Sequence, residues 1–300
     1  MSLSKKKLKN SVRKLIDKEI MEEILSFFED KDCHLWGIEQ PHDYKEINIY
    51  LTIYKYKEYI GYYSLWEKIK VWFHNSHHSL QQNFEIILQF LKLWAKYQIT
   101  TGTLDDWKFA ARNVPKPKEL SGVCLWMDST DFAFVGKKPK YRKSNYWSFK
   151  TESLGYRYQV VFDGLGRIVK IWGGYFPKTA DNIWIDLHKE ELSEIFKGAN
   201  LVADCGYYAS RNHVEGVKFT VPVPATVKTK KTGKKKEIYL TKDQLKKNIS
   251  IRRLRARVEI PFGKIAKKFR SLREPFNEGH KKMDCLVYFI AAIINKSLIF

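Results

Sequence analysis

Apolar residues in the first 120 positions recur at steps of three and four residues, the period of amphipathic helices. The clearest helix follows Ser79, and its apolar face consists of Leu80, Phe84, Ile87, Leu91 and Trp94. Ser79 and Gln82 have the spacing of a capping box, so we expect this helix to begin at Ser79. A second helical pattern occupies residues 62–73, just before the polar break HNSHH. The two helices predict either a DNA-reading helix-turn-helix or an ordinary helix pair in an all-helical domain.

The pattern changes near residue 120, after a stretch that contains Gly102, Pro115, Pro117 and Gly122. Gly and Pro interrupt regular structure, so we place a domain boundary there. The sequence thus predicts an all-helical N-terminal domain over residues 1–120 and a second domain over residues 121–300.

Short apolar runs in the second domain are typical of buried strands. Residues 156–175 favour two strands joined by a turn at residues 163–166. Residues 181–197 predict a helix that Asp181 caps and Gly198 ends. Further strands are expected at 122–128, 200–208 and 218–225, and helices over 241–272 with a kink at Pro261. This order predicts an α/β fold, a mixed sheet with helices on its faces.

Two aspartates in this domain follow buried apolar runs, Asp128 after Val-Cys-Leu-Trp-Met and Asp204 after Leu-Val-Ala. Strand interiors disfavour Asp, so some interaction must compensate for each of them. A turn or a cap would explain either residue alone. Because open α/β sheets form their sites at strand ends, the repeated setting favours a shared site. Asp131, a second acid in the first run, is the alternative to Asp128.

Glu259 is the third candidate acid, and no other Asp or Glu lies between Asp243 and Glu274. It flanks an apolar stripe that includes Ile251, Leu254, Val258 and Phe262, so its side chain is expected near the face that packs on the sheet. The alternative is an ion pair with Arg255, four residues earlier on the same helix.

Positive charge is concentrated around Glu259. The net charge of the chain is +21, and residues 225–282 contribute +15 of it, from 20 Lys and Arg against 5 Asp and Glu. A local basic excess indicates a polyanionic partner, although a solvated basic surface is the alternative. Three clustered carboxylates repel one another, and Mg²⁺ with its preference for oxygen ligands would neutralise them. Two such ions stabilise the attacking and leaving oxygens when a phosphodiester is cut.

The segments MDSTDFAF, LVADCGYY and RRLRARVEIPFGKIAKKFRSL resemble the three catalytic blocks of DDE transposases, of the PIF/Harbinger-like and related superfamily endonuclease kind. The acids of these blocks are Asp128, Asp204 and Glu259, at spacings of 76 and 55 residues. Two positions depart from related insertion-sequence families, which place a Tyr where Arg252 stands and a Lys where Ala266 stands. The resemblance covers about residues 121–300.

This resemblance implies an RNase H-like catalytic domain in which Asp128, Asp204 and Glu259 bind two Mg²⁺ or Mn²⁺ ions. It implies cleavage of double-stranded DNA at the terminal repeats of a transposon and strand transfer into target DNA. The residues expected to contact the DNA backbone are Arg252, Arg255, Lys264 and Lys267. A homodimer and a helper DNA-binding protein are further expectations, because two element ends must be joined.

Two other functions remain open: a transposase-derived DNA-binding protein without catalysis, and a repair or junction nuclease of the same fold. The four cysteines form no CxxC pair, so their spacing suits neither a zinc ribbon nor a disulfide framework. With no secretory signal and with Asp284, Asn295 and Lys296 in the most apolar stretch, we expect a soluble intracellular protein without a membrane span. Its location would be the nucleus in a eukaryote, otherwise the cytoplasm or nucleoid.

Overall fold

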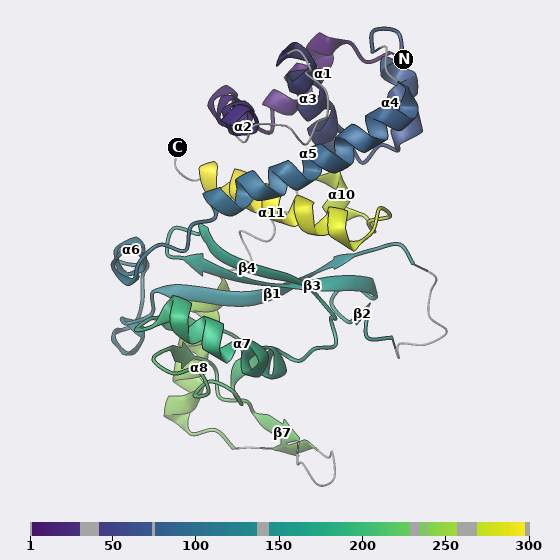
Figure 1. The fold of residues 1–300 in the computed structure, drawn as a ribbon. Coiled ribbons are helices and arrows are strands. Elements are labelled where there is room, and N and C mark those ends of the chain that lie inside the picture. Colours follow the sequence, from purple (N-terminus) through teal and green to yellow (C-terminus); the bar gives the residue numbers. More distant parts are fainter. Residues whose placement is uncertain are drawn as a thin grey trace. The chain divides into compact units, whose positions relative to one another are not determined.

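The computed structural model describes residues 2–30, 42–73, 76–136, 144–228, 235–237, 239–256 and 269–297. The chain divides into two compact units, and neither is continuous in sequence (Figure 1). The first unit comprises Met1–Ile99, Phe132–Lys138 and Lys264–Phe300, and the second comprises Thr100–Asp131 and Pro139–Gly263. The predicted domain boundary near residue 120 stays a prediction.

The first unit is built from helices. They are α1 (Lys5–Arg13), α2 (Lys18–Asp30), α3 (His42–Glu58), α4 (Tyr62–Ile69), α5 (His77–Gln98), α10 (Arg270–Arg273) and α11 (His280–Lys296). Helices α5 and α11 pack along each other, with the rings of Trp94 and Phe289 5.9 Å apart. Helix α11 is buried along most of its length. Within the described ranges, no helix has the length and apolarity that crossing a membrane requires.

Helix α5 has the predicted apolar face but a different start. The five predicted apolar residues are all buried. Its N-cap is Ser76, whose hydroxyl accepts a hydrogen bond from the Ser79 backbone amide at 3.1 Å. The expectation that the helix begins at Ser79 is therefore wrong, because the same capping geometry occurs three residues earlier and His77 and His78 join the helix.

A buried ion pair lies in the core of the first unit. The Lys55 side chain is fully buried, and its ammonium group pairs with Glu278. The aromatic rings of Tyr56 and Tyr62 each lie 4.1 Å from that ammonium, and both hydroxyls donate to Glu278 Oε2, at 3.0 and 2.8 Å. Lys282 approaches Glu278 at 3.9 Å. We refer to these five residues as the Lys55 cluster.

The second unit is built around a mixed sheet. Its strands are β1 (Leu125–Ala133), β2 (Trp147–Ser148), β3 (Ser153–Asp163), β4 (Ile168–Tyr175), β5 (Asn200–Val202) and β6 (Lys218–Thr220). The order is β2-β3-β1-β5-β6, and β4 also pairs with β3. Strands β3 and β4 form the predicted antiparallel hairpin, and the pairs β1–β5 and β5–β6 are parallel. The sheet therefore has the mixed α/β character that the sequence predicted.

Helices cover this sheet (Figure 1). The remaining elements are α6 (Leu104–Ala110), α7 (Asp181–Phe196), α8 (Lys242–Arg255), the short 3-10 helices η2 (Lys118–Leu120) and η3 (Cys205–Tyr207), and the ribbon β7 (Thr226–Lys228) with β8 (Lys235–Glu237). Trp184 of α7 packs on Trp172 of β4, with ring centroids 5.2 Å apart. Trp126 of β1 donates its indole N–H to the carbonyl of Leu254 in α8 at 3.0 Å. These contacts place α7 on β4 and α8 next to β1, the strand that carries Asp128.

Candidate metal site and nucleic-acid interface

Asp128 lies on β1, and Asp204 follows the neighbouring parallel strand β5 by two residues as the N-cap of η3. Leu125 pairs with Leu201 and Trp126 with Val202, an offset of 76 residues. The same offset relates Asp128 to Asp204. The register of the two strands therefore carries these two acids towards each other, and both carboxylates approach the same guanidinium group, that of Arg255.

Each of the two carboxylates is oriented by its own backbone. Asp128 Oδ1 accepts from the Ser129 amide at 2.8 Å, and Asp204 Oδ1 accepts from the Gly206 amide at 2.6 Å as the N-cap of η3. The second oxygen of each is turned to Arg255, which lies 3.2 Å from Asp128 Oδ2 and 4.0 Å from Asp204 Oδ2. One guanidinium group thus serves two acids, in the manner of a counter-ion.

Asp128 lies within strand β1 and does not end it. We expected it to end its strand, but β1 continues to Ala133. Polar residues can continue the strand because Asp131 is compensated: Arg157 donates to it at 2.8 and 3.1 Å, and Ser148 at 2.6 Å. The Asp131 side chain is fully buried in this arrangement.

A third carboxylate near Asp204 was missed as a site residue. Asp181 is the first residue of α7, where Ala180 is the N-cap and no side chain caps the helix, so the predicted cap is wrong. Its carboxylate accepts instead from the Gln159 amide at 3.1 Å. Burial raises the pKa of Asp181, and the charge of Asp204 raises it further. In the sequence, Asp181 is only an Asp at the start of a predicted helix. Asp is common there because it caps helices, so nothing marked Asp181 as a site residue.

Tyr207 lies among these acids. Its side chain is fully buried, and its hydroxyl donates to the Gln159 amide oxygen at 2.5 Å. Burial raises the pKa of Tyr207 well above its usual value, and the charges of Asp181, Asp128 and Asp204 add to the effect. The phenol therefore stays protonated.

The remaining predicted site residues are Arg252, Glu259, Lys264 and Lys267, and the structure describes only the first of them. Arg252 is exposed on α8, where it is free of the acids just described. Glu259, Lys264 and Lys267 lie outside the described residues. Over the part of the chain that the structure does describe, no three His, Cys, Asp or Glu side chains are close enough together to hold one metal ion.

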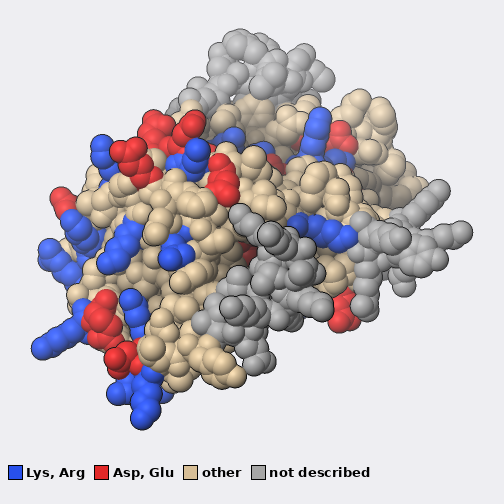
Figure 2. All heavy atoms as spheres, turned by 90° about the horizontal axis from the view of Figure 1, so that it is seen from below, with Lys and Arg blue, Asp and Glu red and all other residues tan. Residues whose placement is uncertain are grey.

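Helix α8 carries much of the described positive charge. Its exposed cations are Lys242, Lys246, Lys247, Arg252 and Arg253, and its one acid is Asp243. Its last residue, Arg255, reaches the two aspartates. In the face that Figure 2 shows, Lys and Arg side chains project among Asp and Glu side chains and do not form one unbroken field. A basic helix that ends at the acids is the feature best suited to a phosphate backbone.

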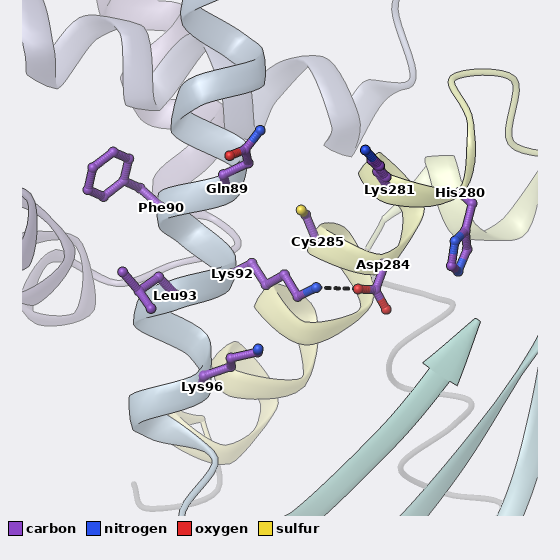
Figure 3. A pocket seen from close by; sticks show the side chains of 9 residues that line it. All are labelled: Gln89, Phe90, Lys92, Leu93, Lys96, His280, Lys281, Asp284 and Cys285. Atoms are coloured by element: carbon purple, nitrogen blue, oxygen red, sulfur yellow. Dashed lines mark hydrogen bonds and ion pairs between the residues drawn. The ribbon is translucent and has the colours of Figure 1, made fainter. Parts of the chain in front are cut away.

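The first unit contains a separate pocket of about 630 Å³ between α5 and α11 (Figure 3). Its lining residues are Gln89, Phe90, Lys92, Leu93, Lys96, His280, Lys281, Asp284 and Cys285. Lys92 and Asp284 form an ion pair across it. The pocket contains none of the predicted acids, and its lysines make it attractive to anions.

A family model described as DDE superfamily endonuclease matches residues 127–295, more than half of the chain. The match starts next to Asp128 and ends within α11. Searches among curated proteins and among solved structures found no match.

Proposed function

Since the chain belongs to the DDE superfamily endonucleases, we propose that it cuts phosphodiester bonds at transposon ends and transfers the strands to target DNA. The observation that carries this proposal is the pair Asp128 and Asp204, held side by side by the register of β1 and β5. Two acids with one shared guanidinium, next to a basic helix, suit a site for cations and phosphates.

The donor set fits divalent metal. Carboxylate oxygens are the ligands that Mg²⁺ and Mn²⁺ prefer, and Mg²⁺ needs only one or two of them. Asp128 and Asp204 would hold the metal through the oxygens that now face Arg255, and Glu259 would complete the set. When bound, two ions stabilise the attacking and leaving oxygens of the in-line displacement.

The chain's own residues have separate tasks. Asp128 and Asp204 keep their orientation through the backbone bonds at Ser129 and Gly206. Arg255, once the metal neutralises the acids, is available to a DNA phosphate, together with Arg252, Lys264 and Lys267. These contacts hold the scissile bond against the carboxylates.

We also propose an RNase H-like fold, a helix-turn-helix and a homodimer for this chain. The antiparallel hairpin β3–β4 beside the parallel strands β1, β5 and β6 supports an RNase H-like fold. Helices α4 and α5, joined by a short connection, support the proposed helix-turn-helix. Homodimerisation would bring two element ends together.

A cleavage assay tests the proposed function. The purified chain is incubated with labelled duplex taken from the DNA that flanks its coding sequence, with Mg²⁺ or Mn²⁺. We expect nicking at a defined end and strand-transfer products. Asp128→Ala should abolish both and leave DNA binding within about twofold, because phosphate contacts provide most of the affinity.

Asp186→Asn is the matched control, since Asp186 pairs with His213 at 2.6 Å on the exposed side of α7. Cleavage retained in Asp128→Ala would overturn the site assignment. Binding by the unchanged chain without nicking would favour a transposase-derived DNA-binding protein, and nicking without strand transfer a repair or junction nuclease.

A further inference from the structure

A hydrogen-bond chain connects the start of α7 to the turn that carries Asp204. Tyr207 donates to the Gln159 amide oxygen at 2.5 Å, and the Gln159 amide nitrogen donates to Asp181 Oδ1 at 3.1 Å. Gln159 and Tyr207 are fully buried. The three residues come from β3, η3 and α7, so the chain ties three elements together.

The hydrogen bonds from Tyr207 to Gln159 and from Gln159 to Asp181 can run in only one direction. An ionised carboxylate can only accept, so Asp181 fixes the nitrogen side of the Gln159 amide. The amide oxygen must then face Tyr207, and the buried phenol must donate. The phenol and the amide nitrogen each thereby have an acceptor, which favours one geometry of this buried polar network.

The turn also packs directly against Asp181. A methyl group added at Gly206 would lie 2.7 Å from Asp181 Oδ2 and 2.8 Å from Asp204 Oδ1. Only a residue without a side chain fits between the two carboxylates. The Gly206 amide is the group that orients Asp204, so the position of Asp181 limits where that amide can lie.

We propose that Asp181, acting through Gln159 and Tyr207, is a positioning residue that sets the orientation of the Asp204 carboxylate for divalent cations. Asp181 is not needed to cap α7, because that helix begins without a side-chain cap. A network of this kind tunes cation affinity as outer-shell partners of metal ligands do. The inference rests on the proposed function, which makes Asp204 a metal ligand.

The test measures cation binding without relying on cleavage. Mg²⁺ or Mn²⁺ is titrated into the full chain, and affinity is obtained from the rise in melting temperature with cation concentration. We expect Asp181→Ala and Gln159→Leu each to raise the dissociation constant roughly tenfold or more. Asp181→Asn, which keeps an acceptor for Gln159, should recover part of that loss. Asp186→Asn is the control on the same helix and should leave the affinity unchanged.

A double variant separates positioning from direct ligation. Asp181→Ala combined with Gln159→Leu should be no weaker than either single variant, because both break one chain. If Asp181→Asn were as harmful as Asp181→Ala and Gln159→Leu harmless, direct ligation would replace positioning. Lower melting temperatures with unchanged cation affinity would leave Asp181 a merely structural role and overturn the inference.

The outcome also distinguishes this inference from the proposed function. An unchanged chain whose melting temperature does not respond to either cation would overturn both. A response that is lost in Asp204→Asn but unchanged in Asp181→Ala would overturn the positioning role alone.

Discussion

The two units each contain a group of buried or half-buried charges, and the two groups are balanced differently. In the Lys55 cluster, Lys55 and Lys282 flank Glu278, and Glu85 pairs with Lys282 at 2.7 Å. With Glu85 counted beside the cluster, two cations there face two acids. In the second unit, Asp128, Asp131, Asp181 and Asp204 share the guanidinium groups of Arg157 and Arg255.

The difference separates a structural role from a functional one. A buried charge with a full set of partners contributes to a defined core, and removing one partner leaves the other stranded. An excess of carboxylates raises the energy of the folded chain until a cation arrives. The acid group of the second unit is thus the one that gains stability from a bound cation, whereas the Lys55 cluster does not need one.

The largest expected effect is on cleavage. Asp204→Asn removes one carboxylate and should lower the cleavage rate at saturating Mg²⁺ by about a thousandfold or more, since it removes a proposed metal ligand. Without metal its free energy of unfolding should be unchanged or slightly higher, because one repelling charge is gone. Rates on labelled duplex and urea unfolding in chelator measure the two quantities. Loss of stability in parallel with activity would erase the contrast with the Lys55 cluster.

Glu278→Gln should show the reverse: a large loss of stability and little change in cleavage rate. It leaves the Lys55 ammonium buried without its ion partner, at a cost of about 3 kcal/mol in the free energy of unfolding. The cleavage rate of the chain that remains folded should change little. Adding Lys55→Met should restore part of the stability, since an apolar side chain of similar size replaces a buried charge. Urea unfolding of both variants decides this, and a loss under about 1 kcal/mol in Glu278→Gln would contradict it.

Gly206→Ala should destabilise the second unit by about 1–3 kcal/mol, because its methyl group overlaps the carboxylates of Asp181 and Asp204. Gly122→Ala is the matched control in the same unit, where the nearest atom to an added Cβ is 3.7 Å away. Equal unfolding midpoints for the two variants would show that the turn is less tightly packed than the structure indicates.

The sequence was sufficient where one periodic pattern determined one element. The buried face of α5 follows from apolar spacing, and the β3–β4 hairpin follows from two apolar runs with a turn between them. The pairing of Asp128 with Asp204 could be anticipated only through the shared strand setting, because their register depends on residues 76 positions apart. Asp181 could not be identified, since its partner Gln159 lies in strand β3 and nothing in the sequence near Asp181 distinguishes it from a helix cap.

The smallest expected effect is a pH dependence specific to the acid group. The pKa of Asp181 is raised in the folded chain, by burial first and then by Asp204, so folding favours its protonated form. That contribution to stability is fully present below the unfolded pKa, near 3.9, and is lost as pH rises through the raised folded pKa. In chelator, the difference in unfolding free energy between the unchanged chain and Asp181→Asn should therefore grow in favour of the variant from about pH 4 towards neutrality. Saturating Mg²⁺ should reduce that trend because the cation offsets the charge, whereas Lys55→Met should leave it unaltered. A difference that stays constant with pH would mean that Asp181 is as fully compensated as the Lys55 cluster.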